Sequence, residues 1–235
     1  MFSLKPRLRA SAIYLAISLS VATLAALLVF GWWYPYPYRE LSGGRELLAL
    51  VVAVDMVLGP LITLVIFNPA KTRRHLVMDF TVIGLLQVAA LAYGLWTVFV
   101  ARPVHLVFEY HRMAVVHAVD IEPETLAKAP PGLQQLPLRG PTLLSLRPLQ
   151  PSEAIESILQ ATGGIPQAAQ TSLWQPYEAA HEQVLKESRP AAQLKERFPS
   201  HADAIDRAVL STGRSLDALR YLPLISRKTA WTVLI

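Results

Sequence analysis

The chain has 235 residues, of which 53% are apolar and only 17% are charged, and its mean hydropathy is +0.35. An ordinary soluble domain carries about 25% charged residues, and this apolar content excludes a disordered chain. Since the sequence has no cysteine, it also excludes a disulfide scaffold, a cysteine-based zinc finger, an iron–sulfur protein and thiol catalysis.

The charges are unevenly distributed along the chain. Residues 1–101 hold eight Lys+Arg and four Asp+Glu, a net charge of +4, whereas residues 102–235 hold fourteen and thirteen, a net charge of +1. The positive excess therefore lies beside apolar segments, as in a membrane protein. The pI near 9.6 is consequently no evidence for nucleic-acid binding, and we expect no nucleic-acid partner.

Three apolar segments predict membrane-spanning helices, at about 11–33, 46–67 and 80–101. A helix of about 20 apolar residues crosses the hydrocarbon core of a bilayer. A cleaved signal peptide is the alternative for the first segment, but its apolar run is too long for one. The run also continues into aromatic residues typical of a membrane interface, which are Trp32, Trp33, Tyr34, Tyr36 and Tyr38. We therefore expect residues 1–101 to form a membrane domain in contact with the lipid bilayer.

The basic flanks predict how these helices are oriented. Lys5, Arg7 and Arg9 precede the first segment, and Lys71, Arg73 and Arg74 lie between the second and third. Positive flanks face the cytoplasm, so the N-terminus and the second loop are expected there. Three spans would then place residues 102–235 in the periplasm of a Gram-negative bacterium, with the chain in its inner membrane.

Residues 102–235 have the composition of a separate α+β domain, with 13 of the 18 prolines. Strand-forming residues predict a hairpin from Val104–Glu109 and Met113–Ile121, a short strand at Thr142–Leu146 and a second hairpin within Tyr221–Ile235 that turns at Arg227-Lys228. Helices are expected to begin at Ser152, Pro176, Pro190 and Ser200, the last ending at Gly213. In the first of these helices, one face is expected to be apolar, formed by Ala154, Ile155, Ile158 and Leu159. In the second helix, the side chains expected to face inward are Tyr177, Ala180, Val184 and Leu185.

Asp55 is an isolated charge in the second apolar segment. A charge at that depth costs roughly 2.5–3.5 kcal/mol, so the carboxyl should be protonated, face water or meet a partner. It either forms an internal hydrogen bond, for example to Gln87 or Tyr93, or serves as a polar contact for another membrane helix. A proton pathway is disfavoured because the segments hold no second acidic residue at mid-depth. The nearby pair Gly59-Pro60 should bend or break the helix, and marks either a docking groove or a simple kink.

The sequence predicts no catalytic residue, no cofactor and no small-molecule substrate. It has no G-x-S-x-G, H-E-x-x-H or P-loop motif. His105 and His117 should approach each other across the first hairpin as two potential metal ligands. No third ligand accompanies them, so we expect no metal.

An ordered set of residues resembles the TfpX/TfpZ type IV pilin accessory proteins, also called FimB-like. The resemblance covers residues 1 to about 121 well and the remainder more loosely. The residues that carry it are Trp33-Tyr34-Pro35-Tyr36-Pro37-Tyr38-Arg39, Leu41-Ser42-Gly43-Gly44, Val54-Asp55, Leu58-Gly59-Pro60-Leu61, Phe67, Asp79, Gln87, Tyr93-Gly94-Leu95 and Arg102-Pro103-Val104. The sequence departs from the family pattern at His75, Val77 and His111-Arg112-Met113, and it reaches Ile235 where a further turn and closing strand are expected.

The resemblance implies a non-enzymatic, chaperone-like inner-membrane protein that helps the major type IV pilin to stay stable or to assemble. Its partner would be the membrane helix and the periplasmic head of that pilin. The candidate partner-binding residues are Asp55, Gly59, Pro60, Gln87 and Tyr93. Small residues such as Gly84 and Gly94 suit packing against a pilin helix or among the three spans themselves. The alternatives are a membrane-anchored periplasmic sensor or scaffold for another partner and, less favoured, a membrane-embedded enzyme.

Overall fold

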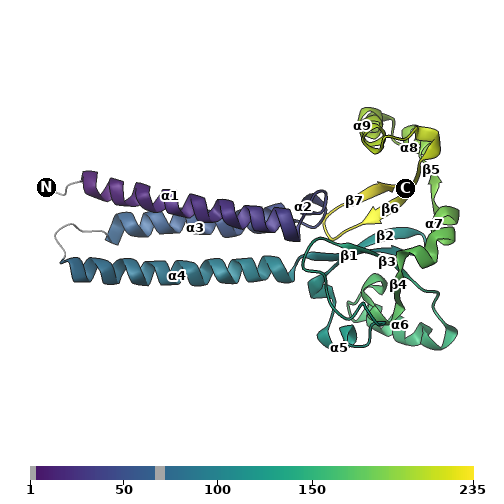
Figure 1. Ribbon diagram of the computed structural model, residues 1–235, viewed down its shortest axis with the longest axis horizontal. Coiled ribbons are helices and arrows are strands. Elements are labelled where there is room, and N and C mark those ends of the chain that lie inside the picture. The colour runs from purple at the N-terminus through teal and green to yellow at the C-terminus, as the bar shows by residue number, and fades with distance from the viewer. Residues whose placement is uncertain (1–3, 67–71) are drawn as a thin grey trace. The chain divides into compact units, whose positions relative to one another are not determined.

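The computed structural model describes residues 4–66 and 72–235 (Figure 1). The chain divides into two compact units, Met1–Arg102 and Pro103–Ile235. The first unit is helical and the second contains a sheet with helices around it.

The first unit is built from three long helices. They are α1 (Leu4–Leu28), α3 (Gly44–Ile66) and α4 (Arg73–Val100), with a π-helical turn η1 (Val29–Trp33) continuing α1 and a short α2 (Tyr38–Leu41) before α3. Helix α3 packs against both α1 and α4. Within the described residues, Ala12–Trp33 and Arg73–Val100 are long and apolar enough to cross a membrane. These ranges overlap the predicted first and third spans in all but one residue each, whereas the predicted second span, in α3, stays a prediction.

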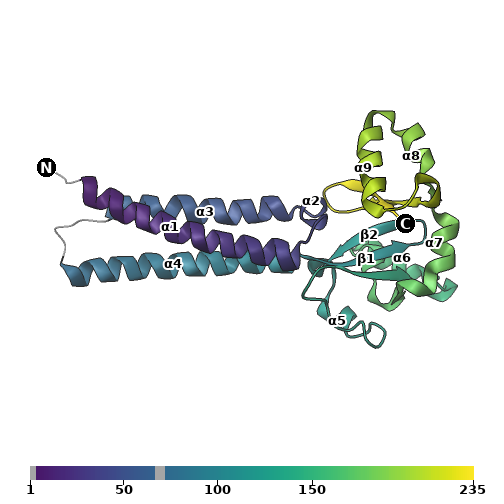
Figure 2. The ribbon, with the colours of Figure 1, turned by 45° about the horizontal axis from the view of Figure 1, so that its top comes forward.

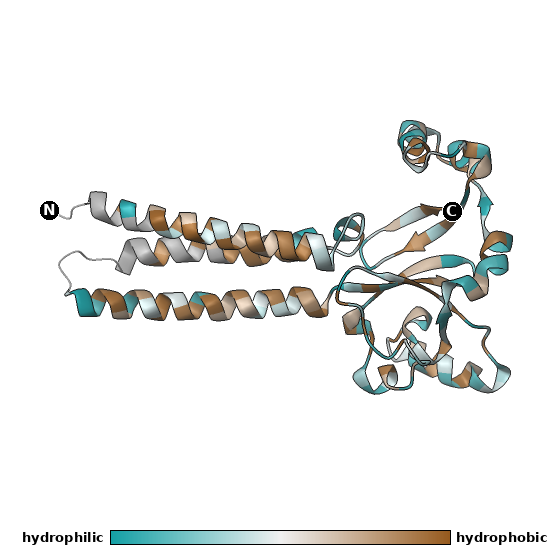
Figure 3. Cartoon of the chain, in the orientation of Figure 1, coloured by the Kyte–Doolittle hydropathy of each residue, from teal (hydrophilic) through white to brown (hydrophobic). Residues whose placement is uncertain are grey.

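Apolar residues occur along the whole length of these helices (Figure 3), and many of them are exposed. The buried cluster is small and consists of Ala25, Val29, Tyr34, Leu48 and Val98. On α4, the consecutive residues Leu85 and Leu86 are both about two-thirds exposed although they point in different directions. A helix that is apolar on several sides suits an apolar environment. The break expected at Gly59-Pro60 does not occur, because α3 remains one α-helix through this pair.

The second unit contains a mixed sheet with the strand order β4-β3-β1-β2-β6-β5, and β7 pairs with β6 (Figures 1 and 2). The strands are β1 (Pro103–Glu109), β2 (Arg112–His117), β3 (Thr142–Leu146), β4 (Trp174–Pro176), β5 (Arg189–Pro190), β6 (Arg220–Ile225) and β7 (Ala230–Leu234). Strand β1 pairs with β2 in an antiparallel hairpin and with β3 in parallel, while β2 pairs with β6 in parallel. The hydrophobic core of this unit includes Val104, Val107, Val116, Leu144 and Trp174.

Both predicted hairpins and the strand Thr142–Leu146 are confirmed. Strand β2 ends at His117 rather than at Ile121. The cause is a 3-10 turn at Ala118–Asp120, in which the Asp120 carboxylate accepts a hydrogen bond from the backbone N–H of His117 at 3.0 Å. The second hairpin turns between Ile225 and Ala230, so Arg227 and Lys228 lie in the turn as predicted.

The helices of the second unit are short. They are α5 (Pro123–Leu126), α6 (Ala154–Thr162), α7 (His181–Glu187), α8 (Ala192–Arg197) and α9 (Ala202–Thr212). Gly213 adopts a left-handed conformation and ends α9 as expected. Ser152 does not cap α6, because it lies inside a 3-10 turn at Pro151–Glu153 that is capped reciprocally by Gln150 and Glu153.

One expectation about side-chain orientation was wrong, and the orientation of a second helix is unusual. In α7, Ala180 in the turn before the helix and Val184 are buried as predicted, but Leu185 is exposed. In α6, the buried position is Ser157, whereas the apolar face is exposed at Ile155, Ile158 and Leu159. Ser157 faces inward because it exchanges two hydrogen bonds with Gln170, from its hydroxyl to the side-chain oxygen at 2.7 Å and from the Gln170 amide to its carbonyl at 2.9 Å.

Candidate functional site

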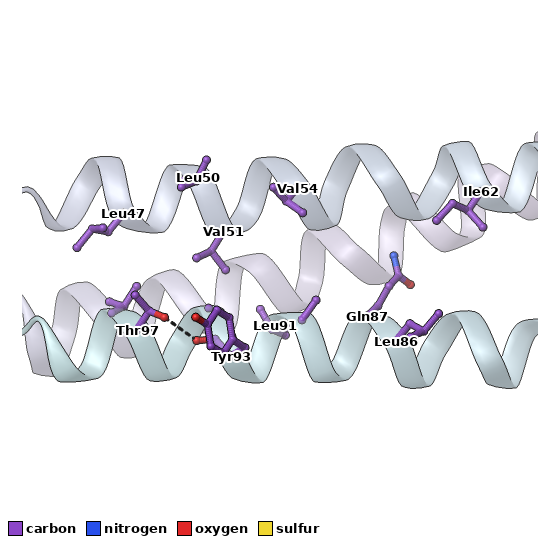
Figure 4. A pocket seen from close by; sticks show the side chains of 13 residues that line it. Leu47, Leu50, Val51, Val54, Ile62, Leu86, Gln87, Leu91, Tyr93 and Thr97 are labelled. Carbon is purple, nitrogen blue, oxygen red and sulfur yellow. Dashed lines mark hydrogen bonds between the residues drawn. The ribbon is translucent and has the colours of Figure 1, made fainter.

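A cavity of about 520 Å³ lies between α3 and α4 (Figure 4). Its lining is almost entirely apolar, with Leu47, Val51 and Val54 from α3 and Leu91 among the residues from α4. Figure 4 shows these side chains facing the space between the two helices. The cavity contains two of the five predicted partner-binding residues, Gln87 and Tyr93.

Gly94 allows α4 to come close to α3 at one side of this cavity. A Cβ atom at Gly94 would lie 2.7 Å from Cγ1 of Val51, which is closer than real Cβ contacts. Glycine is therefore needed here for close packing, as is common between membrane helices. Gly84 on the same helix has no such neighbour, because its Cβ position meets nothing within 4 Å.

Gln87 is the polar feature of the cavity. Its side-chain nitrogen and oxygen are both buried, and neither has a hydrogen-bond partner among the residues described here. In Figure 4 the amide points away from the axis of α4 and into the space beside α3. A buried polar group without a partner costs about 1–3 kcal/mol, so this amide is poised for a group that both donates and accepts.

The other predicted partner-binding residues have different surroundings. The Tyr93 side chain is 75% exposed, and its backbone carbonyl accepts a hydrogen bond from the Thr97 hydroxyl at 3.0 Å. Asp55, Gly59 and Pro60 belong to helix α3, but their side chains lie outside the described residues. The expected bond between Asp55 and Gln87 or Tyr93 therefore stays a prediction.

The five aromatic residues predicted to form an interfacial belt do not share one environment. Trp32 and Tyr36 are exposed, whereas Trp33 and Tyr38 are partly buried, and Trp33 lies 5.0 Å from Phe99 between ring centres. Tyr34 is completely buried, and the interfacial belt stays a prediction. The hydroxyl of Tyr34 donates to the carbonyl of Val98 at 3.2 Å.

Gly44 explains how Tyr34 fits inside the helical unit. A Cβ at Gly44 would lie 2.4 Å from Cδ1 of the tyrosine ring, so only glycine leaves room for it. Tyr34 therefore connects the end of η1 with the start of α3 and the end of α4. The sequence contained both residues, but nothing in their spacing indicated that the ring packs over the glycine.

The histidines of the first hairpin lie near each other on paired strands. His105 pairs with Val116 and His117 with Pro103 across the ladder, and the described residues contain no cluster of three potential ligands. The His105 Nδ1 lies 2.8 Å from the Thr142 hydroxyl, and its ring contacts Trp174 edge-on at 4.7 Å. Burial lowers the pKa of His105 from 6.5 to about 4, so the ring is neutral at physiological pH.

Comparison with known proteins identifies relatives over nearly the whole chain. The family model of the fimbrial assembly protein FimB matches residues 2–43. A fimbrial assembly protein of serogroup I from Dichelobacter nodosus is 34% identical over 229 residues, covering 96% of this chain and 89% of the relative. The serogroup E1 protein of the same organism is 31% identical over 228 residues, with the same two coverages. A third, from serogroups C1 and C2, is 37% identical over 119 residues, which is 51% of this chain and 91% of that protein. No solved structure matches the chain.

Proposed function

Because the chain belongs to the FimB family of fimbrial assembly proteins, we propose that it acts in pilus biogenesis as a chaperone-like accessory protein of the inner membrane. Its partner is the major type IV pilin, whose stability or assembly it supports. In this proposal α1, α3 and α4 span the membrane, the N-terminus is cytoplasmic and residues 103–235 form a periplasmic domain. The protein acts by binding and has no enzymatic activity.

The observation that carries this proposal is the buried amide of Gln87, which has no hydrogen-bond partner among the described residues, in an otherwise apolar cavity. If α3 and α4 lie in a membrane, water is absent, and the occupant must satisfy its own backbone hydrogen bonds. A lipid chain can fill the apolar part of the cavity but cannot hydrogen-bond to the amide. A transmembrane helix with one polar side chain can do both, and in this proposal the occupant is the membrane helix of the pilin.

The first prediction tests the amide directly with the Gln87→Leu substitution. If Gln87 binds a pilin helix, the Leu variant removes an unsatisfied buried group, so the abundance of this protein should stay normal or rise. Pilin abundance and surface pili should fall, because the pilin side chain would then lose its partner, at a cost of about 1–3 kcal/mol. Immunoblots of both proteins and counts of surface pili measure the result. A Leu variant with normal pili would remove Gln87 from the mechanism.

Photo-crosslinking provides the matched control on the same helix. Leu91 lines the cavity, whereas Leu85 is exposed elsewhere and lies about 200° around α4 from Gln87, at 100° per residue. A crosslinker placed at Leu91 should capture pilin, and one placed at Leu85 should capture much less. Equal capture at both positions, or none at Leu91, would contradict binding in this cavity.

A further inference from the structure

A second cavity of the helical unit, of about 430 Å³, lies between α1 and α3. It shares no lining residue with the α3–α4 cavity. Three alanines line it, Ala22 and Ala26 on α1 and Ala49 on α3, and their short side chains leave space between the two helices. All of its lining residues other than Thr23 and Arg45 are apolar. The cavity therefore accepts an apolar ligand.

The two ends of the α1–α3 cavity differ. Helices α1 and α3 run in opposite directions (Figure 1), so Phe30 and Arg45 lie at the end where α3 begins, and Leu19 and Met56 lie at the other end. The lining thus extends over about 16 Å on each helix, at 1.5 Å per residue. The hydrocarbon core of a bilayer is about 30 Å thick, so the acyl chains of one leaflet extend over about 15 Å. In the membrane topology proposed above, the cavity has the length of one acyl chain, and its charged end faces the periplasmic surface.

Arg45 is the charged group at this end of the cavity. Its side chain is 64% exposed, and its Nη1 lies 3.6 Å from Oε1 of Glu40, which is longer than a hydrogen bond. Glu40 also lies 3.9 Å from Arg39, so two guanidinium groups share this carboxylate. Neither Glu40 nor Glu46, the residue after Arg45, lines the cavity. Within the part of the chain that the structure describes, the Arg45 guanidinium makes no hydrogen bond, so its N–H donors are available to an anion.

The other polar group of the cavity needs no ligand. Thr23 donates from its hydroxyl to the carbonyl of Leu19 at 2.8 Å. The cavity therefore suits an apolar chain with a negative charge at one end, in contrast to the α3–α4 cavity with its buried amide. A phosphodiester is an anion of this kind, because its oxygens accept the parallel N–H bonds of a guanidinium. The exposure of Arg45 leaves the rest of such a headgroup in water.

We propose that the α1–α3 cavity binds a glycerophospholipid, with one acyl chain between the two helices and its phosphate on Arg45. This inference rests on the membrane topology proposed above but not on pilin binding, which is assigned to the other cavity. The lipid supplies the apolar chain and the anion at the spacing that the cavity requires. Its chain fills the space beside the alanines and thereby stabilises the contact between α1 and α3.

Photolabelling of the full-length protein in a non-ionic detergent tests the proposal. The probe is phosphatidylglycerol with a diazirine halfway along one acyl chain, and the control probe is the diacylglycerol with the same chains, which lacks the phosphate. Peptide mass spectrometry should find adducts of the phospholipid at residues 19–30 and 45–56, at least about tenfold above those of the diacylglycerol, as expected for a charge-assisted hydrogen bond. Equal labelling by the two probes, or adducts mainly outside these segments, would overturn the proposal. Excess inorganic phosphate should not displace the probe, and displacement would indicate a site for a free anion instead of a lipid.

Variants then test the two parts of the site. Arg45→Gln should lower labelling by phosphatidylglycerol about tenfold, to the level of the diacylglycerol. Arg39→Gln removes a charge beside the same carboxylate but outside the cavity, and it should keep the original labelling. Ala49→Trp should block both probes, because the position is exposed and the ring can fill the cavity, whereas Ala89→Trp at an exposed position of α4 should not. Undiminished labelling in either cavity variant would contradict the assigned site.

Discussion

Gly94 shows, at the scale of one residue, how close packing creates the α3–α4 cavity. Its missing side chain lets Val51 lie against the backbone of α4, and the cavity opens beside this contact. Gly84 lies on the same helix without such a neighbour. The two glycines therefore form a matched pair in which the same substitution has opposite consequences.

We predict that Gly94→Ala destabilises the helical unit by about 1–3 kcal/mol, because the new methyl group overpacks against Val51. Gly84→Ala should be neutral or slightly stabilising, since alanine favours a helix by about 1 kcal/mol over glycine where space allows. Thermal unfolding in detergent and steady-state abundance measure both effects. Equal loss of stability in the two variants would show that helix propensity or membrane insertion, rather than the Val51 contact, sets the outcome.

We predict that the buried His105 side chain makes the stability of the second unit depend on pH. Its pKa is lowered to about 4 by burial, against 6.5 in the unfolded chain. The folded state thus keeps the ring neutral while the unfolded state takes up a proton. Stability is complete above about pH 6.5 and is lost as the pH falls towards 4, by about 3 kcal/mol at most, given 1.36 kcal/mol per pKa unit.

Thermal unfolding between pH 7.5 and 4.5 measures this loss. The full-length protein should lose stability on acidification, and His105→Gln should show a smaller slope because glutamine does not titrate. His111→Gln, in the exposed turn of the same hairpin, serves as the control and should keep the original slope. If the two variants had the same pH dependence, another group would be responsible.

At the scale of one element, helix α6 turns its polar side, rather than its apolar face, towards the interior of the second unit. Ser157 and Gln170 bond to each other inside the unit, while Ile155, Ile158 and Leu159 are exposed. An amphipathic pattern normally predicts the reverse orientation. The two hydrogen bonds between buried groups contribute more to stability here than burial of the apolar face would. Each of these polar groups would lose its partner if the helix turned its apolar face inward.

This orientation predicts that a substitution on the polar side of α6 or its partner is more damaging to stability than one on its apolar face. Gln170→Leu should destabilise the second unit by about 1–3 kcal/mol, because it leaves buried groups of Ser157 without a partner. Ile158→Gln should change stability by no more than about 0.5 kcal/mol, since that side chain is 65% exposed. Thermal unfolding of the full-length protein compares them. Greater damage from Ile158→Gln would show that α6 packs by its apolar face.

At the scale of the whole molecule, the proposed function requires a defined orientation in the membrane. The basic residues before the first apolar segment and between the second and third predict a cytoplasmic N-terminus and second loop. The helices that overlap the predicted first and third spans are apolar and long enough to cross.

Reporter fusions test that orientation. Alkaline phosphatase, which is active only in the periplasm, should be active when fused at Gly132 or Gly164, both in positive-φ turns of the second unit. The same reporter fused at Lys71 should be silent. The reverse pattern would contradict both the orientation and the proposed contact with a periplasmic pilin head, and activity at all three sites would contradict the number of spans.

Local patterns determined much of the secondary structure of this protein. The long apolar runs predicted the helices of the first unit, and β-branched residues beside turn residues predicted both hairpins, because these signals depend on neighbours in the sequence. Gln87 was also selected from the sequence, as a polar residue in an apolar segment. Asp55, selected in the same way, still awaits its experiment.

Only the tertiary structure decided how these elements meet. The parallel pairing of β2 with β6 joins segments about a hundred residues apart, and no local signal encodes such a partner. Three other features also depend on segments that are distant in the sequence. They are the burial of Tyr34 over Gly44, the contact of Gly94 with Val51 and the inward polar side of α6. Periodicity states which residues share a face, but the neighbour packed against that face determines whether it is buried, and that neighbour comes from elsewhere in the chain.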